Sequence, residues 1–208
     1  MHEMDTYKLL VQGYAHPGPD NNSYFASPSC VLVYSNGKKV LIDPGADKEK
    51  LLTALSNEGL RVDDIDIVFL THWHPDHFLN IRLFPNHDIM DATTIWRDTG
   101  EEVFPEGELM SKIPGTNIVI LATPGHREEH VSLLVNTADQ GVVCIAQDVF
   151  WWEDGKQLEN PIEEELLALD DPFLADKDEL ITSRKLVLEK ANWIIPGHGK
   201  MFRNPRKN

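Results

Sequence analysis

The sequence HWHPDH at residues 72–77 places three histidines and an aspartate within six positions. It directly follows the apolar segment 66–71, which is predicted to be a strand. Imidazole and carboxylate groups suit zinc or iron, and a short turn at a strand end can direct several of them at one centre. The chain must therefore fold so that this strand end lies within reach of any remaining ligands.

Three more candidate ligands lie in the same kind of place, just after a predicted strand. His126 ends the sequence TPGH, His198 lies within PGHG, and Asp148 follows the apolar run 141–146, where a carboxylate could bridge two metal ions. This recurrence disfavours the alternative that the histidines of residues 72–77 occur in a polar turn by chance. The pattern predicts a metal site assembled from several strand ends.

Short apolar runs bounded by turn residues alternate with two helical patterns. Strands are predicted at residues 7–12, 30–34, 39–43, 65–71, 117–123, 131–136, 141–146 and 193–195, and helices at 47–58 and 176–191. Asn36-Gly37 is a typical hairpin turn. The segments 91–115 and 150–172 are acidic and interrupted by Gly and Pro, so we expect loops there. The pattern favours an α/β architecture with helices outside the sheets.

Length and charge limit the classes of function. With 208 residues the chain can form one compact domain over 1–208, and its net charge of −15 disfavours nucleic acid as a partner. Cys30 and Cys144 lie far apart in apolar runs and indicate no disulfide framework. The N-terminal sequence resembles no signal peptide, and no apolar run is long enough to cross a membrane. We therefore expect a cytoplasmic protein without a membrane partner.

The ordered ligand set resembles the metallo-β-lactamase superfamily. Agreement extends to Asn22-Ser23-Tyr24 and to Leu41-Ile42-Asp43-Pro44-Gly45, so the resemblance covers nearly the whole chain. It implies a four-layer αβ/βα sandwich with two metal ions at one edge, between two sheets. It further implies that one metal is bound by His72, His74 and His126, the other by Asp76, His77 and His198, and that Asp148 bridges them.

Within the superfamily, the chain is similar to the metallo-β-lactamase domain-containing protein 1 group and its short prokaryotic relatives. The similarity lies in residues 79–85, in the sequence QDVF at 147–150 and in IPGHG at 195–199. Two positions depart from the common pattern. Trp73 is large where many relatives carry a small residue, and Gln147 replaces a frequent glycine. We expect these two residues to narrow or reshape the pocket.

The ligand set predicts hydrolysis, because a hydroxide held between two divalent metal ions is available near neutral pH. Zinc is the first choice of metal, and iron or manganese also suit these ligands. Asp76 is assigned two tasks, as a metal ligand and as the group that orients the hydroxide. Asp43 is expected to hold a ligand histidine in the right tautomer. The alternative for Asp43 is a turn-capping role before Pro44.

Other aromatic residues and histidines leave alternatives open. An apolar pocket is predicted from Trp73, Phe78, Phe150, Trp151 and Trp152, although core packing would explain about half of them equally well. His130 would share a face with His126 if HREEH were helical, but the strand pattern from residue 131 favours a supporting role for it. His16 lies in a loop that could reach over the site.

Three functions are weighed. The first is hydrolysis of a small ester, thioester or lactone, with a small molecule as the partner. The second is an RNA or DNA phosphodiesterase, for which the basic residues near the motifs are Arg82, Arg97, Lys112 and Arg127. The third is a metal-dependent binding or signal-response protein. The resemblance and the Trp-rich segment 150–152 are compatible with a homodimer.

Overall fold

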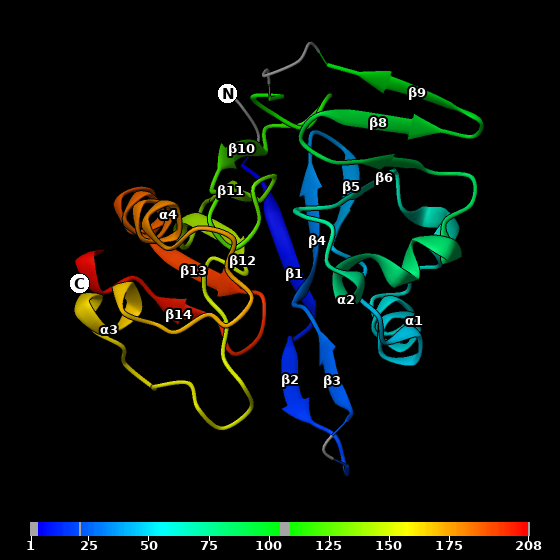
Figure 1. Ribbon diagram of the computed structural model, residues 1–208. Coiled ribbons are helices and arrows are strands. Elements are labelled where there is room, and N and C mark those ends of the chain that lie inside the picture. Colours follow the sequence, from blue (N-terminus) through cyan, green and yellow to red (C-terminus); the bar gives the residue numbers. More distant parts are fainter. Residues whose placement is uncertain (1–3, 21, 105–108, 208) are drawn as a thin grey trace.

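Two β-sheets face each other in the computed structural model, which describes residues 4–20, 22–104 and 109–207 (Figure 1). The seven-stranded sheet has the order β1-β4-β5-β6-β7-β8-β9 and the five-stranded sheet the order β10-β11-β12-β13-β14. The first sheet comprises β1 (Thr6–Val11), β4 (Cys30–Ser35), β5 (Lys38–Ile42), β6 (Ile67–Phe69), β7 (Asp88–Met90), β8 (Thr94–Arg97) and β9 (Gly100–Val103). The second comprises β10 (Val119–Ala122), β11 (Val131–Thr137), β12 (Gly141–Gln147), β13 (Trp193–Pro196) and β14 (Phe202–Arg203).

The longer helices cover the outer faces of the two sheets. Helix α1 (Lys48–Asn57) begins at the N-cap Asp47 and packs beside the first sheet, and α4 (Lys177–Lys190) begins at the N-cap Asp176 and packs beside the second. Two short helices, α2 (Pro75–Phe78) and α3 (Glu163–Leu167), and the 3₁₀ turns Val62–Asp64, Leu79–Leu83 and Pro205–Lys207 complete the helical elements. The predicted four-layer αβ/βα sandwich is confirmed. None of the described helices has the length and apolar character needed to cross a bilayer.

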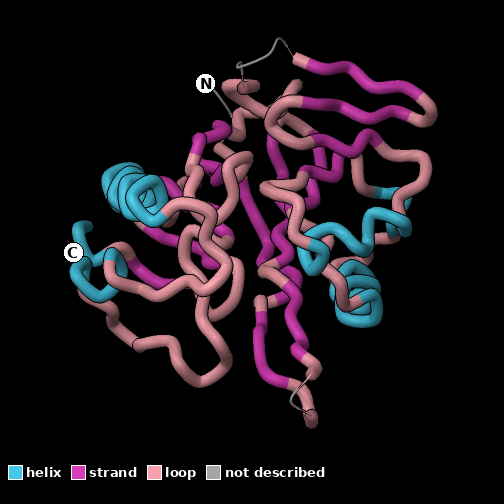
Figure 2. The backbone as a smooth tube through the Cα atoms, in the orientation of Figure 1, coloured by secondary structure: helices cyan, strands magenta, loops and turns pink. Residues whose placement is uncertain are grey.

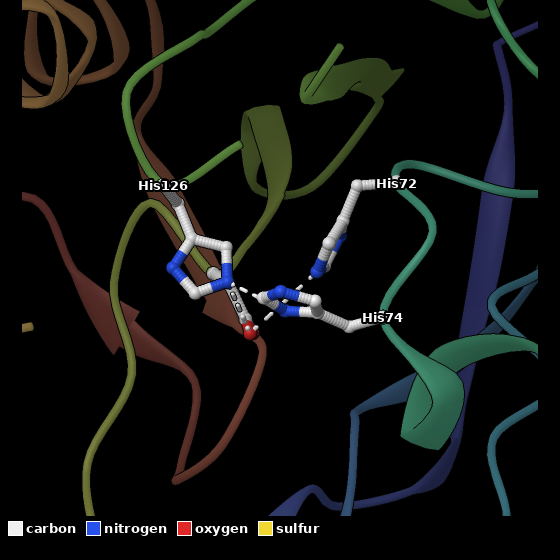
Figure 3. Close-up of side chains that lie close together, drawn as sticks. His72, His74 and His126 are labelled. Atoms are coloured by element: carbon white, nitrogen blue, oxygen red, sulfur yellow. Dashed lines mark hydrogen bonds and ion pairs between the residues drawn. The ribbon is translucent and has the colours of Figure 1, made fainter. Parts of the chain in front are cut away.

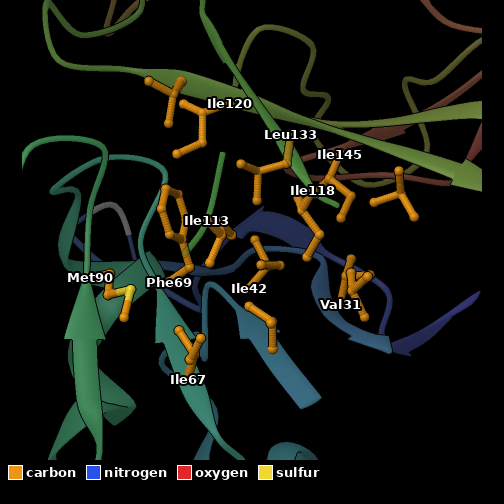
Figure 4. Close-up of a cluster of buried hydrophobic side chains, with 14 of the residues drawn as sticks. Val31, Ile42, Ile67, Phe69, Met90, Ile113, Ile118, Ile120, Leu133 and Ile145 are labelled. Carbon is orange, nitrogen blue, oxygen red and sulfur yellow. The ribbon is translucent and has the colours of Figure 1, made fainter. Parts of the chain in front are cut away.

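The central core lies between the sheets and follows from strand alternation. In β4, Val31 and Val33 belong to the cluster between the sheets, whereas Leu32 packs with the cluster under α1. In β12, Ile145 faces the first sheet and Cys144 faces α4. Successive side chains of a strand point to opposite faces, so a strand buried on both faces reads as a continuous apolar run. Figure 4 shows this central cluster.

Several elements differ from the sequence-based expectation. The segment 91–115, predicted as a loop, contains β8 and β9, and its residues 105–108 lie outside the described part of the chain. The segment 150–172 contains α3, and a separate hairpin is formed by β2 (Tyr14–Pro17) and β3 (Tyr24–Ser27) (Figure 2). These elements are short, and every residue of β9 is exposed. They therefore lack the apolar periodicity from which a strand or helix is predicted.

Candidate metal centre

The histidine-rich motif occupies the turn that leaves the end of β6. The backbone of His74 is extended, and Pro75 then occupies the first position of α2, where its fixed φ suits a helix start. The single turn of α2 carries Asp76 and His77. Both His72 and His77 are fully buried, so this short segment directs its imidazoles into the protein.

The remaining candidate ligands come from three strand ends of the second sheet. His126 follows β10, Asp148 follows β12 and His198 follows β13. Strands β12 and β13 are parallel, and their register pairs Gln147 with Pro196, which brings Asp148 and His198 to the same edge. A side chain at position 197 would collide with the Asp148 carboxylate, so glycine is required there.

Asp148 lies at the centre of the group. Its Oδ2 lies 3.2 Å from His126 Nε2 and 3.8 Å from His72 Nε2. Its Oδ1 lies 3.4 Å from His77 Nε2 and 3.6 Å from His198 Nε2. Each carboxylate oxygen therefore faces a different pair of histidines, as a bridging carboxylate requires. Figure 3 shows His72, His74 and His126 turned toward one another, with His74 Nδ1 2.9 Å from His126 Nε2.

Three groups of ligand atoms are close enough together to hold a metal ion, and in each group the atoms lie within 4.8 Å of one another. We call two of them the first site (His72, His74, His126 and Asp148) and the second site (Asp76, His77 and His198). The third, Asp43 with His72 and His77, shares both of its histidines with these sites. His72 Nε2, His77 Nε2 and Asp148 Oδ1 are buried without a hydrogen-bond partner. Buried polar atoms normally have partners, so a metal ion fits these residues.

Three acceptors hold the ligand imidazoles from behind. Asp43 Oδ2 lies 2.8 Å from His77 Nδ1, Asp171 Oδ2 lies 2.7 Å from His126 Nδ1, and the carbonyl oxygen of Tyr14 lies 2.9 Å from His198 Nδ1. An acceptor at Nδ1 fixes the proton there and leaves the Nε2 lone pair for a metal ion. Asp43 is thus the acceptor that faces the Nδ1 atom of His77.

Asp43 does not cap the turn before Pro44. Its carboxylate accepts hydrogen bonds from the Thr71 amide at 2.8 Å and from the Thr71 hydroxyl at 2.6 Å, and so ties the end of β5 to the start of the histidine motif. The backbone of Asp43 is left-handed, with φ of 44°. This conformation is costly outside glycine, and such strain persists only where the surrounding contacts impose it.

Asp171 is the residue that sequence reasoning missed. It lies in the irregular segment 150–172, 45 residues beyond the histidine it contacts, and no periodic pattern marks it. The one available signal was indirect: His126 needed an outer acceptor, and an acidic segment followed Asp148.

Burial and neighbouring charges together shift the pKa values of the candidate ligands. Burial and the charge of His77 lower the pKa of His72 well below its ordinary value. Burial opposes the charged form of His126 and His198 as well, but hydrogen bonds and charges from Asp148 and the neighbouring carboxylates raise the pKa of each to about 9. Burial would raise the pKa of Asp148, yet the charges of His77 and His198 hold it well below its ordinary range. The metal-free centre therefore combines neutral and protonated histidines around ionised carboxylates.

Neither of the two remaining candidate histidines belongs to a ligand group, although the ring of His130 packs against His72 with the centroids 4.8 Å apart. Residues 124–130 form turns and no helix, so HREEH does not present a helical face. His130 is buried, its Nδ1 lies 3.0 Å from the Thr123 hydroxyl, and burial next to His126 lowers its pKa to about 3. His16 lies in β2 beside Phe25 and does not line the cavity at the centre.

A cavity of about 480 Å³ opens onto the metal centre. Its floor includes Asp76, Asp148 and His198. The remaining lining residues are mostly apolar or aromatic and come from the β2–β3 hairpin, from the turn between β5 and α1, from α2 and its flanks and from the segment after β12: Ala15, Tyr24, Phe25, Ala26, Ala46, His74, Pro75, Leu79, Trp151 and Phe173.

Of the five aromatic residues predicted to line the pocket, only Trp151 does so. Phe150 is fully buried in the core under α4, because the turn after β12 directs its ring inward against Phe202, and Trp152 packs on the same ring. Trp73 and Phe78 instead pack together on the surface, with their ring centroids 5.4 Å apart.

The two departures from the common pattern do not reshape this cavity. Trp73 donates from its indole nitrogen to Asp91 at 3.0 Å and does not line the cavity. Gln147 is buried and donates to the Ser29 carbonyl oxygen at 2.9 Å, which links the two sheets next to Asp148.

Residues 24–110 match the family model described as the metallo-β-lactamase superfamily. The human metallo-β-lactamase domain-containing protein 1 is 34% identical over 228 residues, covering 94% of this chain and 80% of the relative. A Thermotoga maritima structure provisionally described as a metallo-β-lactamase has a TM-score of 0.69 and 20% identity, over 97% of this chain and all of the other. A quorum-quenching N-acyl homoserine lactone lactonase has a TM-score of 0.62 and 17% identity, over 95% and 94% of the two chains. At these identities, the two structures show a shared fold.

Proposed function

Because the chain belongs to the metallo-β-lactamase superfamily of metal-dependent hydrolases, we propose that it hydrolyses a small ester, thioester or lactone with an apolar acyl group. The observation that carries this proposal is the composition of the cavity over Asp76 and Asp148. Its walls are mainly apolar, and none of the described residues that line it is a lysine or an arginine. An apolar group can be buried there, whereas the walls offer the phosphates of a nucleic acid no lysine or arginine side chain.

The walls favour an acyl chain of modest size. Ala15, Ala26 and Ala46 leave room beside the floor, while Trp151 and Phe173 stack with ring centroids 5.7 Å apart on another side. Burying each methylene of a substrate in such a site contributes about 0.8 kcal/mol. A cavity of about 480 Å³ lies within the range of small-molecule sites.

The residues would divide the chemistry as follows. His72, His74 and His126 would hold one metal ion, His77, His198 and Asp76 the other, and Asp148 would contact both. When bound, two divalent ions supply a hydroxide near neutral pH and polarise a substrate carbonyl. Asp76 lines the cavity and lies 3.3 Å from His198 Nε2, which supports the proposal that its carboxylate would orient a nucleophile and accept its proton.

We propose zinc as the resident metal. The donor set consists of imidazole nitrogens and carboxylate oxygens, which zinc binds readily, and the same donors also suit iron or manganese. Metal analysis of the purified protein distinguishes these ions.

The phosphodiesterase alternative receives no support from the cavity. The four basic residues considered for phosphate contact, Arg82, Arg97, Lys112 and Arg127, do not line it. Arg97 is already engaged by Asp88 and Glu102, and Arg127 lies 3.8 Å from Glu129.

The experiment combines metal analysis by mass spectrometry with turnover on p-nitrophenyl esters of increasing acyl length, thioesters, lactones and bis-p-nitrophenyl phosphate. Wild type is compared with Asp148→Ala and with Glu128→Ala, which removes an exposed carboxylate outside both ligand groups. We expect about two metal ions per chain, as a dinuclear centre requires, and carbonyl turnover lost only in Asp148→Ala. Phosphodiester turnover alone would overturn the proposal in favour of a nuclease. Two metals with no turnover on any substrate would favour a binding role.

A further inference from the structure

Arg184 is a charged side chain inside the protein that the reaction itself does not use. It lies on α4 and is only 2% exposed. Its guanidinium group does not reach the cavity and donates instead to main-chain carbonyl oxygens. A buried arginine is costly unless its donors are satisfied, and Nη2 of Arg184 is buried without a hydrogen-bond partner among the described residues, so this side chain requires an explanation.

The carbonyl groups that Arg184 contacts lie next to residues of the metal centre. Its Nε donates to the Val149 carbonyl at 3.0 Å, one residue beyond Asp148. Its Nη1 donates to the Leu169 carbonyl at 2.6 Å, two residues before Asp171, and to the Leu167 carbonyl at 3.3 Å. One planar group therefore holds together the two segments that carry the central carboxylate and the acceptor for His126.

We propose that Arg184 is a positioning residue for the first site, acting through the main chain on Asp171 and hence on His126. The proposal rests on the metal centre described above. Asp171 is almost completely buried, and its carboxylate contacts His126 and accepts from the Phe173 amide at 2.9 Å. If its segment shifted, the Nδ1 contact of His126 would lengthen and the orientation of the imidazole would be lost.

Arg184 contacts neither of the segments that carry the acceptors of the second site, and it is connected to His198 through the main chain after Val149, where the Phe150 carbonyl accepts from the Gly197 amide at 3.1 Å. His77 is held by Asp43, which is bonded to Thr71 in the first sheet, and His198 is held by the Tyr14 carbonyl. Loss of Arg184 should therefore weaken metal binding unequally. Only its bond to Val149 approaches Asp148, which faces both sites.

The geometry of the group matters as much as its charge. Burial lowers the pKa of Arg184 to about 10, and the charges of Asp171 and Asp170 oppose this, so the side chain stays charged at neutral pH. A lysine would keep the charge, but its single ammonium cannot reproduce donors fixed in one plane. Arg184→Lys therefore separates the effect of charge from that of positioning.

The test measures both metal affinities by competition with a chromophoric chelator in wild type, Arg184→Lys and Arg184→Met. Asn204→Ala is the matched control, because Asn204 is a fully buried residue that donates to the Leu188 and Ala191 carbonyls at the far end of α4. We expect Arg184→Met to lower the affinity for the first-site metal at least about tenfold, as for the loss of an outer partner of a ligand, and to lower the affinity for the second-site metal less than about twofold. Arg184→Lys should be intermediate, and Asn204→Ala should change neither affinity.

A second measurement works even if Arg184→Met does not fold. In zinc-loaded protein labelled with ¹⁵N-histidine, the Nδ1 protons of His77 and His126 are compared by hydrogen exchange. Arg184→Lys should accelerate exchange at His126 and leave His77 unchanged. Equal effects on both protons, or a parallel loss of both metals, would overturn the proposal. Absence of metal binding in wild type would instead overturn the metal centre itself.

Discussion

The two sheets contribute to the metal centre in different ways. The first sheet supplies His72, His74, Asp76 and His77 from one continuous turn after β6. The second supplies His126, Asp148 and His198 from three strand ends that are far apart in the sequence. The first group is held by Asp43 and Thr71 at neighbouring strand ends, whereas His126 depends on Asp171 in a distant irregular segment.

The two sheets therefore fix the positions of their ligand side chains in different ways. A compact turn fixes four side chains with few contacts, because the backbone itself sets their spacing. Separate strand ends must be aligned by sheet pairing and by buried polar contacts from elsewhere. The second group should therefore be more sensitive to changes made far from it.

The strongest test of the comparison is Asp148→Ala, which removes a carboxylate that lies within 3.8 Å of two histidines from each sheet. We expect the dinuclear centre to be lost and kcat/KM to fall by more than about a hundredfold, the upper range for losing an outer partner of a metal ligand. Metal content and turnover check this. Retention of two tightly bound metals would show that the remaining ligands hold both metals without Asp148.

Two further variants, Asp43→Asn and Asp171→Asn, test separately the acceptor for His77 and the acceptor for His126. Each should weaken a different metal by about 10-fold to 100-fold, Asp43→Asn at the second site and Asp171→Asn at the first. Asp43→Asn should also destabilise folding by about 1 to 3 kcal/mol more, because Asp43 accepts two bonds from Thr71. Chelator competition and denaturant unfolding measure these effects, with the exposed neighbour in Asp170→Asn as control. Identical metal losses in both variants would contradict the assignment.

The pH dependence of metal affinity should differ between the first and the second site. In metal-free protein Asp148 and Asp43 raise the pKa of His77 well above its ordinary value despite burial, and the pKa values of His126 and His198 are about 9. These protons must leave when a metal binds, so affinity rises with pH up to about 9 and falls in acid.

The second site releases protons from His77 and His198, whereas the first releases one from His126, because burial keeps His72 and His74 neutral. At neutral pH the affinity should therefore change by up to about a hundredfold per pH unit at the second site and about tenfold at the first. Chelator competition at about pH 6.5, 7.5 and 8.5 measures the slope of affinity against pH for each metal. Equal slopes would contradict this division.

The smallest effect is expected for Gln147→Gly, at the junction of the two groups. Gln147 has a left-handed φ of 46°, a conformation that costs about 1 kcal/mol for residues other than glycine. The variant removes this strain, but it also loses the hydrogen bond to the Ser29 carbonyl, which contributes about 1 kcal/mol. The free energy of unfolding should stay within about 1 kcal/mol of wild type. A larger loss in denaturant unfolding would mean that this link between the sheets is stronger than an ordinary hydrogen bond.

The sequence was informative where chemistry and periodicity coincide. The buried strands could be predicted because both of their faces are apolar. The residues that the structure brings together at the candidate centre could be selected because each follows a predicted strand. Asp171 could not be predicted, because its contact with His126 depends on the path of an irregular segment and not on a regular spacing in the sequence. Phe150 was assigned to the pocket wrongly, since one backbone turn after β12 decides whether a ring faces the cavity or the core.

The parallel pairing of β12 and β13 has an evolutionary consequence. Parallel neighbours need a long crossover connection, and here that connection carries Trp151 and Phe173 of the cavity wall together with Asp171 and Arg184. Selection for a new substrate range in this stretch would therefore act on metal retention at the same time. A loop transplanted between β12 and α4 would have to bring its own support for His126, or the chain would gain a new specificity while losing an ion.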